Sequence, residues 1–186
     1  MALHSNMRFT ISLVLMFVAA AARADCPPPP DISAEEDQLL SEIRASGTEM
    51  AARPLTDRLW RLWTKAPDEP AQSLLDEGME ARNTYDYLRA LGDFDKLVKY
   101  CPDYAEGYNQ RAFVNFLRED YAAALPDLDK ALARSPKHVA AMSGKALTLM
   151  HLGRDDEAQA VLRQALALHP WLPERYFLKK PAGTDL

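Results

Sequence analysis

The sequence has few of the residues from which enzyme active sites are usually built. Its 186 residues include two cysteines and four histidines. No glycine-rich phosphate loop, H-E-x-x-H metal motif or G-x-S-x-G nucleophile motif occurs in it. His4 lies in the segment 1–24, and His138 and His169 lie near prolines, so only His151 is expected to face a binding surface. We therefore predict a protein that is not an enzyme and that holds neither a metal nor a cofactor.

Basic residues are outnumbered as well. The chain has 22 Lys and Arg residues against 27 Asp and Glu residues, and the basic residues form no block. Nucleic acids and anionic membranes are recognised mainly through clustered positive charge. The composition therefore argues against either of them as the partner.

Residues 1–24 have the pattern of a secretory signal. Arg8 precedes the apolar run Phe9–Ala22, which is shorter than the roughly 20 residues that a spanning helix needs. Ala22-Arg23-Ala24 matches the A-x-A pattern of a cleavage site. We predict export, to a bacterial periplasm, with cleavage after Ala24 and no membrane span afterwards. Cleavage removes two basic residues and no acidic one, so the mature chain would have a net charge of −7.

Residues 71–172 contain one pattern three times. Segments starting at Ala71, Ala105 and Val139 align without a gap, so the pattern recurs at a constant spacing. The period, about 34 residues, is typical of stacked helical hairpins, none of which can bury its apolar face alone. Small residues, apolar residues or proline recur in six columns: Leu74, Tyr108 and Met142; Gly78, Ala112 and Ala146; Ala90, Ala124 and Ala158; Phe94, Leu128 and Leu162; Leu97, Ala131 and Ala165; Pro102, Pro136 and Pro170.

These columns resemble those of the tetratricopeptide repeat (TPR) family. That pattern has a small residue at unit position 8, Ala at 20, a large apolar residue at 24, a small one at 27 and Pro at 32. The resemblance implies an all-α fold, a right-handed α-solenoid of helical hairpins. Its three units would be residues 71–104, 105–138 and 139–172, with Gly92 inside a helix of the first unit.

The segments before the repeats predict a strap and a further helical pair. Residues 25–33 include the run Pro27–Pro30, which favours an extended polyproline strap. Residues 34–70 read as a degenerate N-terminal hairpin in the place of a preceding unit. Trp60 and Trp63 would then cover the open end of the first repeat, and an aromatic ligand platform is the alternative.

Two local patterns concern the ends of the helical region. Ser33 and Glu36 predict a capping box at the start of the first helix. Residues 173–186 predict a short C-terminal cap and tail. Tyr176, Phe177 and Leu178 would cover the last repeat helix, unless that helix is left open as an association surface.

Cys26 and Cys101 are the cysteines of the chain. An exported protein meets an oxidising compartment, where two thiols commonly pair. A disulfide between Cys26 and Cys101 would staple the strap to the array, and a buried Cys101 with a free Cys26 is the alternative.

The resemblance also implies a concave groove lined by the first helix of each unit. Its floor would be largely apolar, and adaptable Met side chains would suit an amphipathic helix or an extended apolar peptide. The groove residues carried over from the family positions, including the polar ones that could fix a peptide's direction, are Leu75, Met79, Arg82, Asn83, Asn109, Phe113, Phe116, Ser143, Leu147, Met150 and His151.

Chaperone-adaptor members of the family hold a peptide's terminal carboxylate with Lys, Asn and Arg. The corresponding positions here are Leu75, Met79, Ala140 and Gly144, so that clamp is missing. We therefore predict a non-enzymatic protein–protein interaction module that binds a peptide or helix in its groove. The alternative is a structural protein that stacks into homodimers or filaments through its open solenoid end, with the groove filled by its own strap.

Overall fold

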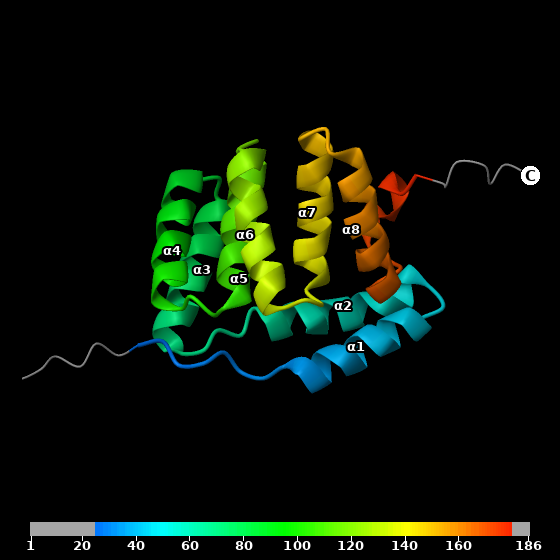
Figure 1. Ribbon diagram of the computed structural model, residues 1–186. Coiled ribbons are helices and arrows are strands. Elements are labelled where there is room, and N and C mark those ends of the chain that lie inside the picture. The colour runs from blue at the N-terminus through cyan, green and yellow to red at the C-terminus, as the bar shows by residue number, and fades with distance from the viewer. Residues whose placement is uncertain (1–24, 180–186) are drawn as a thin grey trace, which may run out of the picture.

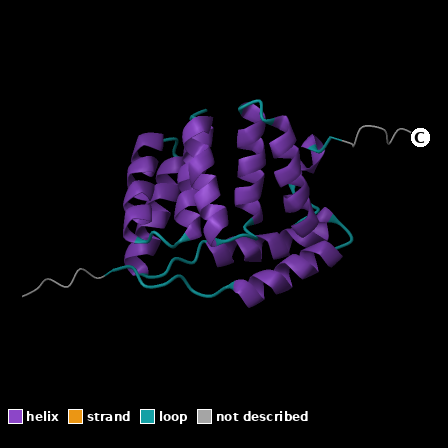
Figure 2. Cartoon of the chain, viewed as in Figure 1, coloured by secondary structure: helices purple, strands orange, loops and turns teal. Residues whose placement is uncertain are grey.

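The computed structural model describes residues 25–179, which form eight α-helices and one 3₁₀ helix (Figures 1 and 2). The predicted signal segment and residues 180–186 of the predicted tail lie outside the described residues. The prediction of an all-α fold of stacked helical hairpins is confirmed. The elements are α1 (Ser33–Ala45), α2 (Glu49–Trp63), α3 (Glu69–Asn83), α4 (Tyr87–Tyr100), α5 (Ala105–Leu117), α6 (Tyr121–Arg134), α7 (Val139–His151), α8 (Asp155–Leu168) and η1 (Pro173–Phe177).

The helices α3 to α8 form three hairpins that stand side by side (Figure 1). Each hairpin packs most closely within itself, and α4 with α5 and α6 with α7 join neighbouring hairpins. Phe94, Leu128 and Leu162 occupy the same position in successive units, and all three are buried. Gly92 lies inside α4, as the gap-free repeat spacing requires.

The tight turns of the three hairpins share one backbone conformation. Tyr85, Glu119 and Gly153, which occupy the same position in successive units, have φ angles of 63°, 62° and 71°. This left-handed region suits glycine and costs other residues about 1 kcal/mol or more. The third turn therefore has the residue that the geometry favours, and the first two adopt the same turn without it.

The N-terminal hairpin, α1 with α2, does not occupy the place of a preceding repeat. It lies across the lower edge of the array, beneath α5 to α8 (Figure 1). Its buried Leu39, Ile43 and Leu59 share a core cluster with Met142 of α7 and Ala165 of α8. The expectation that Trp60 and Trp63 cover the open end of the first repeat is therefore wrong.

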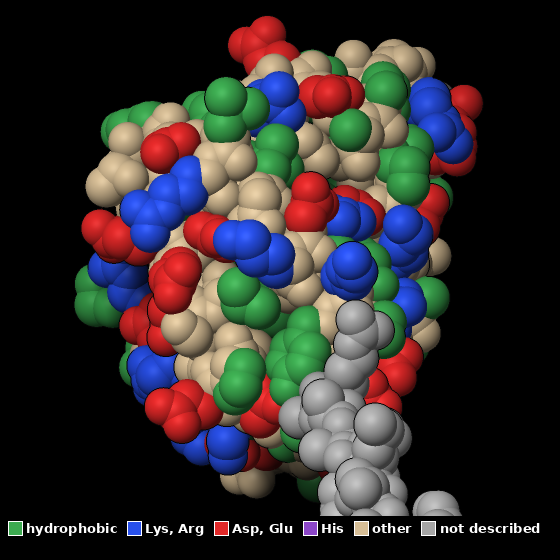
Figure 3. Space-filling model, turned by 90° about the vertical axis from the view of Figure 1, so that its left-hand side faces the viewer, with side chains coloured by type: hydrophobic (Ala, Val, Ile, Leu, Met, Phe, Trp, Pro, Cys, Tyr) green, Lys and Arg blue, Asp and Glu red, His purple; other side chains and the backbone are tan. Residues whose placement is uncertain are grey.

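The outer face of the first repeat is left uncovered by the hairpin. Figure 3 shows this end of the molecule, where Lys and Arg side chains mix with Asp and Glu side chains around smaller hydrophobic patches. A face of mixed charge can be solvated without a cap, which the repeat pattern alone does not predict. Over residues 25–179, no helix has the length and hydropathy needed to cross a bilayer.

The last repeat helix, α8, is covered mainly by α7 and α1 and not by the C-terminal residues that were expected to cover it. Ala158, Leu162 and Ala165 of α8 are fully buried, and α8 contacts α7 and α1. The residues predicted to cover α8 are largely exposed to solvent: Tyr176 and Phe177 of η1 are 80% and 55% exposed. The tail is instead held by polar contacts, and Gln159 of α8 donates a hydrogen bond to the Phe177 carbonyl at 3.0 Å.

Candidate functional site: the groove between α5 and α7

A pocket of about 270 Å³ opens between the leading helices of the second and third repeats. We call it the groove pocket. Its walls are mainly apolar and include a few polar side chains, most of them buried. The lining residues are Trp60, Asn109, Gln110, Ala112, Phe113, Phe116, Leu128, Ala140, Ser143, Gly144, Leu147, Thr148, Leu172, Pro173 and Glu174.

Five of the residues expected in the groove meet in this pocket. Asn109, Phe113 and Phe116 come from α5, and Ser143 and Leu147 come from α7. Successive residues on one face of a helix recur every three or four positions, which is why these side chains form two facing rows. Phe113 is 43% exposed, unusual for a phenylalanine, and makes the pocket accessible from solvent.

The residues expected from α3 are placed differently. Leu75 is fully buried between α3 and α4 and cannot contact a partner, so its assignment to the groove is wrong. Met79 packs against the same core cluster. Neither these two residues nor Asn83 lines the groove pocket.

Met150 and His151, expected in the groove from α7, lie beyond the pocket at the end of that helix. The His151 ring stacks on Tyr121 with ring centroids 4.4 Å apart and meets Phe116 edge-on at 5.4 Å. His151 is exposed, and these neighbours are aromatic. The contacts indicate that His151 packs against α5 and α6 at the top of the array.

Arg82 of α3 borders the pocket from the first repeat. Its guanidinium carbon lies 5.1 Å from the centre of the Phe113 ring, within the range of a cation–π contact. Its Nη1 donates to Gln110, and its Nε and Nη2 donate to Asn83 at 3.3 and 2.9 Å. Partial burial lowers the pKa of Arg82, and the charge of Glu106 opposes that shift. The guanidinium stays protonated at neutral pH.

Four lining residues come from parts of the chain outside the repeats or at their end. Trp60 reaches the pocket from α2, and Leu172, Pro173 and Glu174 reach it from the segment after α8. Repeat positions contain no information on these contacts, because neither segment follows the repeat period. The sequence signal for Trp60 was the alternative of an aromatic ligand platform.

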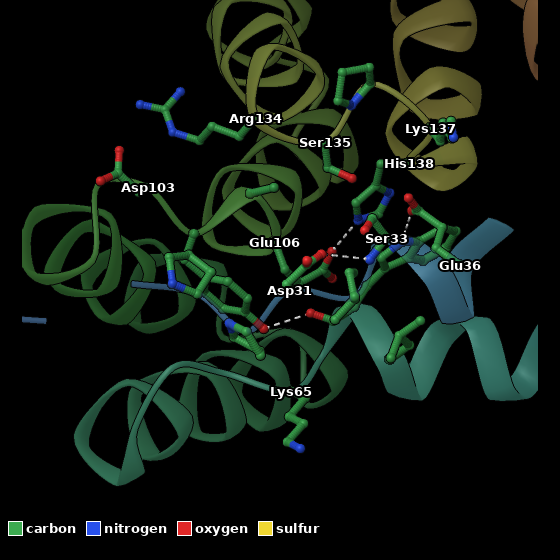
Figure 4. A pocket seen from close by; sticks show the side chains of 18 residues that line it. Asp31, Ser33, Glu36, Lys65, Asp103, Glu106, Arg134, Ser135, Lys137 and His138 are labelled. Carbon is green, nitrogen blue, oxygen red and sulfur yellow. Dashed lines mark hydrogen bonds and ion pairs between the residues drawn. The ribbon is translucent and has the colours of Figure 1, made fainter. Parts of the chain in front are cut away.

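A buried polar network lies beneath the groove, at the lower edge of the array (Figure 4). His138 Nε2 and Glu106 Oε2 are 2.7 Å apart, and each side chain is 1% exposed. Asn109 and Gln110 also donate to the Glu106 carboxylate, and Gln110 accepts from Arg82. A buried carboxylate is costly unless donors surround it, and here three side chains donate to Glu106. A satisfied network of this kind holds its side chains in fixed positions, so it rigidifies the side of α5 that carries the groove residues.

Trp63 locks the N-terminal hairpin onto this network. Its ring stacks on His138 with centroids 4.0 Å apart, and its Nε1 donates to Glu36 at 2.8 Å. Tyr104 donates to the Trp63 carbonyl at 2.7 Å. The Glu36 carboxylate thus accepts a hydrogen bond from a residue distant in sequence. The predicted capping box is wrong, since α1 has no side-chain cap.

The strap runs along the same lower edge and does not enter the groove. Pro29 and Pro30 line a separate cavity of about 370 Å³, with Glu106 and His138 at its inner end (Figure 4). No residue of the strap lines the groove pocket. The alternative in which the strap fills the groove is therefore contradicted.

The strap is anchored by a disulfide between Cys26 and Cys101, with Cα atoms 5.1 Å apart. Cys101 is the C-cap of α4, and the bond joins positions separated by 75 residues. Among residues 25–179, no three His, Cys, Asp or Glu side chains converge as metal ligands would. The chemistry that the site offers is burial of apolar side chains with a few directed hydrogen bonds.

The comparisons with known proteins agree with the repeat architecture. The tetratricopeptide repeat family profile matches residues 116–174. A TPR repeat-containing protein of Rhizobium etli is 26% identical over 134 residues, which cover 72% of this chain and 66% of that protein. Tetratricopeptide repeat protein 36 of Mus musculus is 31% identical, over 58% of this chain and 60% of the relative. The chain thus spans less than two thirds of the length of these relatives.

Solved structures show the same fold. The Arabidopsis OM64 TPR domain superimposes with a TM-score of 0.57 and 23% identity, over 59% of this chain and 90% of that domain. The first TPR domain of Spaghetti (RPAP3), solved bound to an HSP90 peptide, gives a TM-score of 0.57 and 22% identity over 58% of this chain and 86% of that one.

The fold and the repeat spacing are those of tetratricopeptide repeat hairpins. Residues 116–174 match the tetratricopeptide repeat family, and the described residues have the fold of three such hairpins, with an N-terminal hairpin docked along their lower edge.

Proposed function

We propose that the groove pocket binds an apolar segment of a partner protein, either an amphipathic helix or an extended stretch, after export of this chain to the bacterial periplasm. The observation that supports binding is a solvent-open pocket with facing apolar rows on α5 and α7, including the partly exposed Phe113. Its volume of about 270 Å³ lies just below the usual range for small-molecule sites. It suits one or two large side chains of a peptide.

Recognition of a terminal carboxylate is not supported by the groove residues. Two structural neighbours were solved in complex with pHsp70 and with an HSP90 peptide. In this chain the positions of the corresponding clamp are Leu75, Met79, Ala140 and Gly144. None of these can bind a carboxylate through its side chain, and Leu75 is fully buried. An internal apolar segment is therefore the better ligand.

The test is photo-crosslinking in the cells that produce the protein. A photoreactive amino acid at Leu147 should capture a partner, and Phe113→Asp in the same chain should abolish the capture. Leu88→Asp is the matched control, because Leu88 is 75% exposed, lies on α4 and does not line the pocket. Equal loss of capture with Phe113→Asp and Leu88→Asp would contradict binding in the groove.

Two observations support export. The segment 1–24 has a basic start, an apolar run and the Ala22-Arg23-Ala24 cleavage pattern. The Cys26–Cys101 disulfide is the kind of bond that persists in oxidising compartments such as the periplasm.

Export is tested by fractionating cells that express the full chain and sequencing the N-terminus of the product. We expect the protein in the periplasmic fraction, starting at Asp25. Replacing the apolar run Phe9–Ala22 by a polar segment should retain it in the cytoplasm. An uncleaved chain in the cytoplasm of unmodified cells would contradict the proposal.

A further inference from the structure

We propose that the partner segment carries an apolar anchor between an acidic and a basic side chain, so that the groove pocket recognises charge of both signs across one apolar contact. This inference rests on the proposed function, since it assigns the chemistry of the segment that the same pocket binds. It comes from two charged side chains of this protein, Arg82 and Glu174, that lie on opposite sides of the pocket.

Arg82 is a cation at the α3 side of the pocket whose hydrogen-bond partners are all neutral. A guanidinium has five N–H donors, and three of them are used by Gln110 and Asn83. Within residues 25–179, no carboxylate forms an ion pair with Arg82. Its electrostatic neighbour Glu106 is already bonded to His138, Asn109 and Gln110. Two N–H groups therefore remain for a carboxylate of the partner.

Glu174 is an anion at the opposite side of the pocket. One carboxylate oxygen accepts a hydrogen bond from the Ser143 hydroxyl at 3.2 Å. None of the lysine and arginine side chains in the described part of the chain forms an ion pair with Glu174. The neighbouring Arg175 pairs with Glu49 instead. Glu174 is partly buried, where an unpaired carboxylate gains most from a cation supplied by a ligand.

The apolar contact lies between these two charges. Arg82 contacts Phe113 on α5, and Glu174 contacts Ser143 on α7, and both contacted residues line the pocket. Neighbouring packed helices lie about 8–10 Å apart. On a bound helix, residues one turn before and one turn after an anchor are about 12 Å apart, so they extend beyond one helix spacing on both sides of the anchor. Trp60 of α2 also lines the pocket and would contact the anchor itself.

The inference is tested with four synthetic helical peptides that share one central Trp anchor. They differ only at the positions four residues before and after it, which are Glu and Lys, Glu and Glu, Lys and Lys, or Gln and Gln. Titration calorimetry at low salt should show the Glu and Lys peptide binding at least about threefold more tightly than the others, a modest gain typical of partly exposed ion pairs.

Reversing either charge in the protein should change which of the four peptides binds most tightly. Glu174→Lys gives the pocket two cations, so the Glu and Glu peptide should bind best. Arg82→Glu gives it two anions, so the Lys and Lys peptide should bind best. Arg163→Glu makes the same charge change as Arg82→Glu on an exposed residue of α8 that does not line the pocket, and it should leave the order unchanged.

The outcomes separate this inference from the proposed function. Equal affinity for all four peptides, or an order that both variants leave unchanged, would overturn the inference. If Leu147→Asp still abolishes binding of the uncharged peptide in that case, the proposed function stands. If no peptide binds, or if binding is insensitive to Leu147→Asp, both are overturned.

Discussion

The ring of Phe94 occupies the space that a side chain at Gly78 would need. A Cβ built on Gly78 would lie 2.5 Å from Cε1 of Phe94, well inside van der Waals contact. The equivalent pairs in the other two units are Ala112 with Leu128 and Ala146 with Leu162. The first hairpin thus combines a larger residue on its second helix with a smaller one on its first.

This complementarity predicts the effect of Gly78→Ala. The added methyl group must displace the Phe94 ring, and overpacking of this kind costs about 1–3 kcal/mol of unfolding free energy. Phe94→Leu alone should also destabilise, by about 1 kcal/mol, because it leaves a small cavity. The double variant recreates the pair of the second unit and should recover most of the loss. Urea unfolding of all four proteins gives the coupling energy, and simple additivity would contradict the packing argument.

The disulfide should contribute strongly to stability. It closes a loop of 75 residues, and closing a long loop stabilises by about 2–4 kcal/mol through the unfolded state. Cys26→Ser combined with Cys101→Ala should therefore lower the thermal midpoint by several degrees. A reducing agent should lower the midpoint of the unmodified protein alone. Equal sensitivity of both proteins to reductant would argue against the bond.

His169 should make the protein less stable in acid. Burial lowers the pKa of the His169 imidazole below its usual 6.5, and its Nε2 lies 2.8 Å from the Thr56 hydroxyl of α2. The unfolded chain therefore takes up a proton below about pH 6.5 that the folded chain resists. Stability should fall as the pH falls through this range, by at most about 1.4 kcal/mol per pH unit from this group.

Denaturant unfolding at pH 7.5 and pH 5.5 measures this effect. His169→Gln should flatten the pH dependence of the unfolding free energy. A pH profile that His169→Gln leaves unchanged would rule out His169 as the source.

The buried network beneath the groove should be costly to break from one side. Glu106→Ala removes the acceptor for His138, Asn109 and Gln110, which leaves three buried donors without their partner. Each buried donor that is left unpaired costs about 1–3 kcal/mol. Calorimetric unfolding should show that loss, whereas Glu119→Ala, an exposed turn residue, should change stability far less. A small effect of Glu106→Ala would mean that water replaces the carboxylate.

The repeat spacing was enough to predict the arrangement of α3 to α8. Phe94 and Leu128 occupy the same position in successive units and both are buried, so periodicity carries structural information. Gly92 illustrates the strength of this signal, because the spacing places it inside α4 despite the cost of glycine in a helix.

The placement of the N-terminal hairpin could not be predicted in this way. It depends on single contacts between distant residues, such as Trp63 on His138 and Thr56 with His169, which occur once and follow no period. The same reason explains why Trp60 and Glu174 were absent from the predicted groove. The prediction for Leu75 was wrong for the opposite reason. The family pattern assigns its repeat position to the groove, but in this chain the side chain is buried against α4.

The central claim is that the face between α5 and α7, bounded by Trp60, is the surface that binds a partner segment. Nuclear magnetic resonance titration with the Glu and Lys peptide described above tests it most directly. We predict that the largest shifts fall on the Trp60 indole N–H, the Ser143 amide and the Leu147 methyl groups, and that residues of the strap and of the α3–α4 turn stay unchanged. Shifts that cluster on the strap or on the first repeat, with those three signals unmoved, would contradict the account.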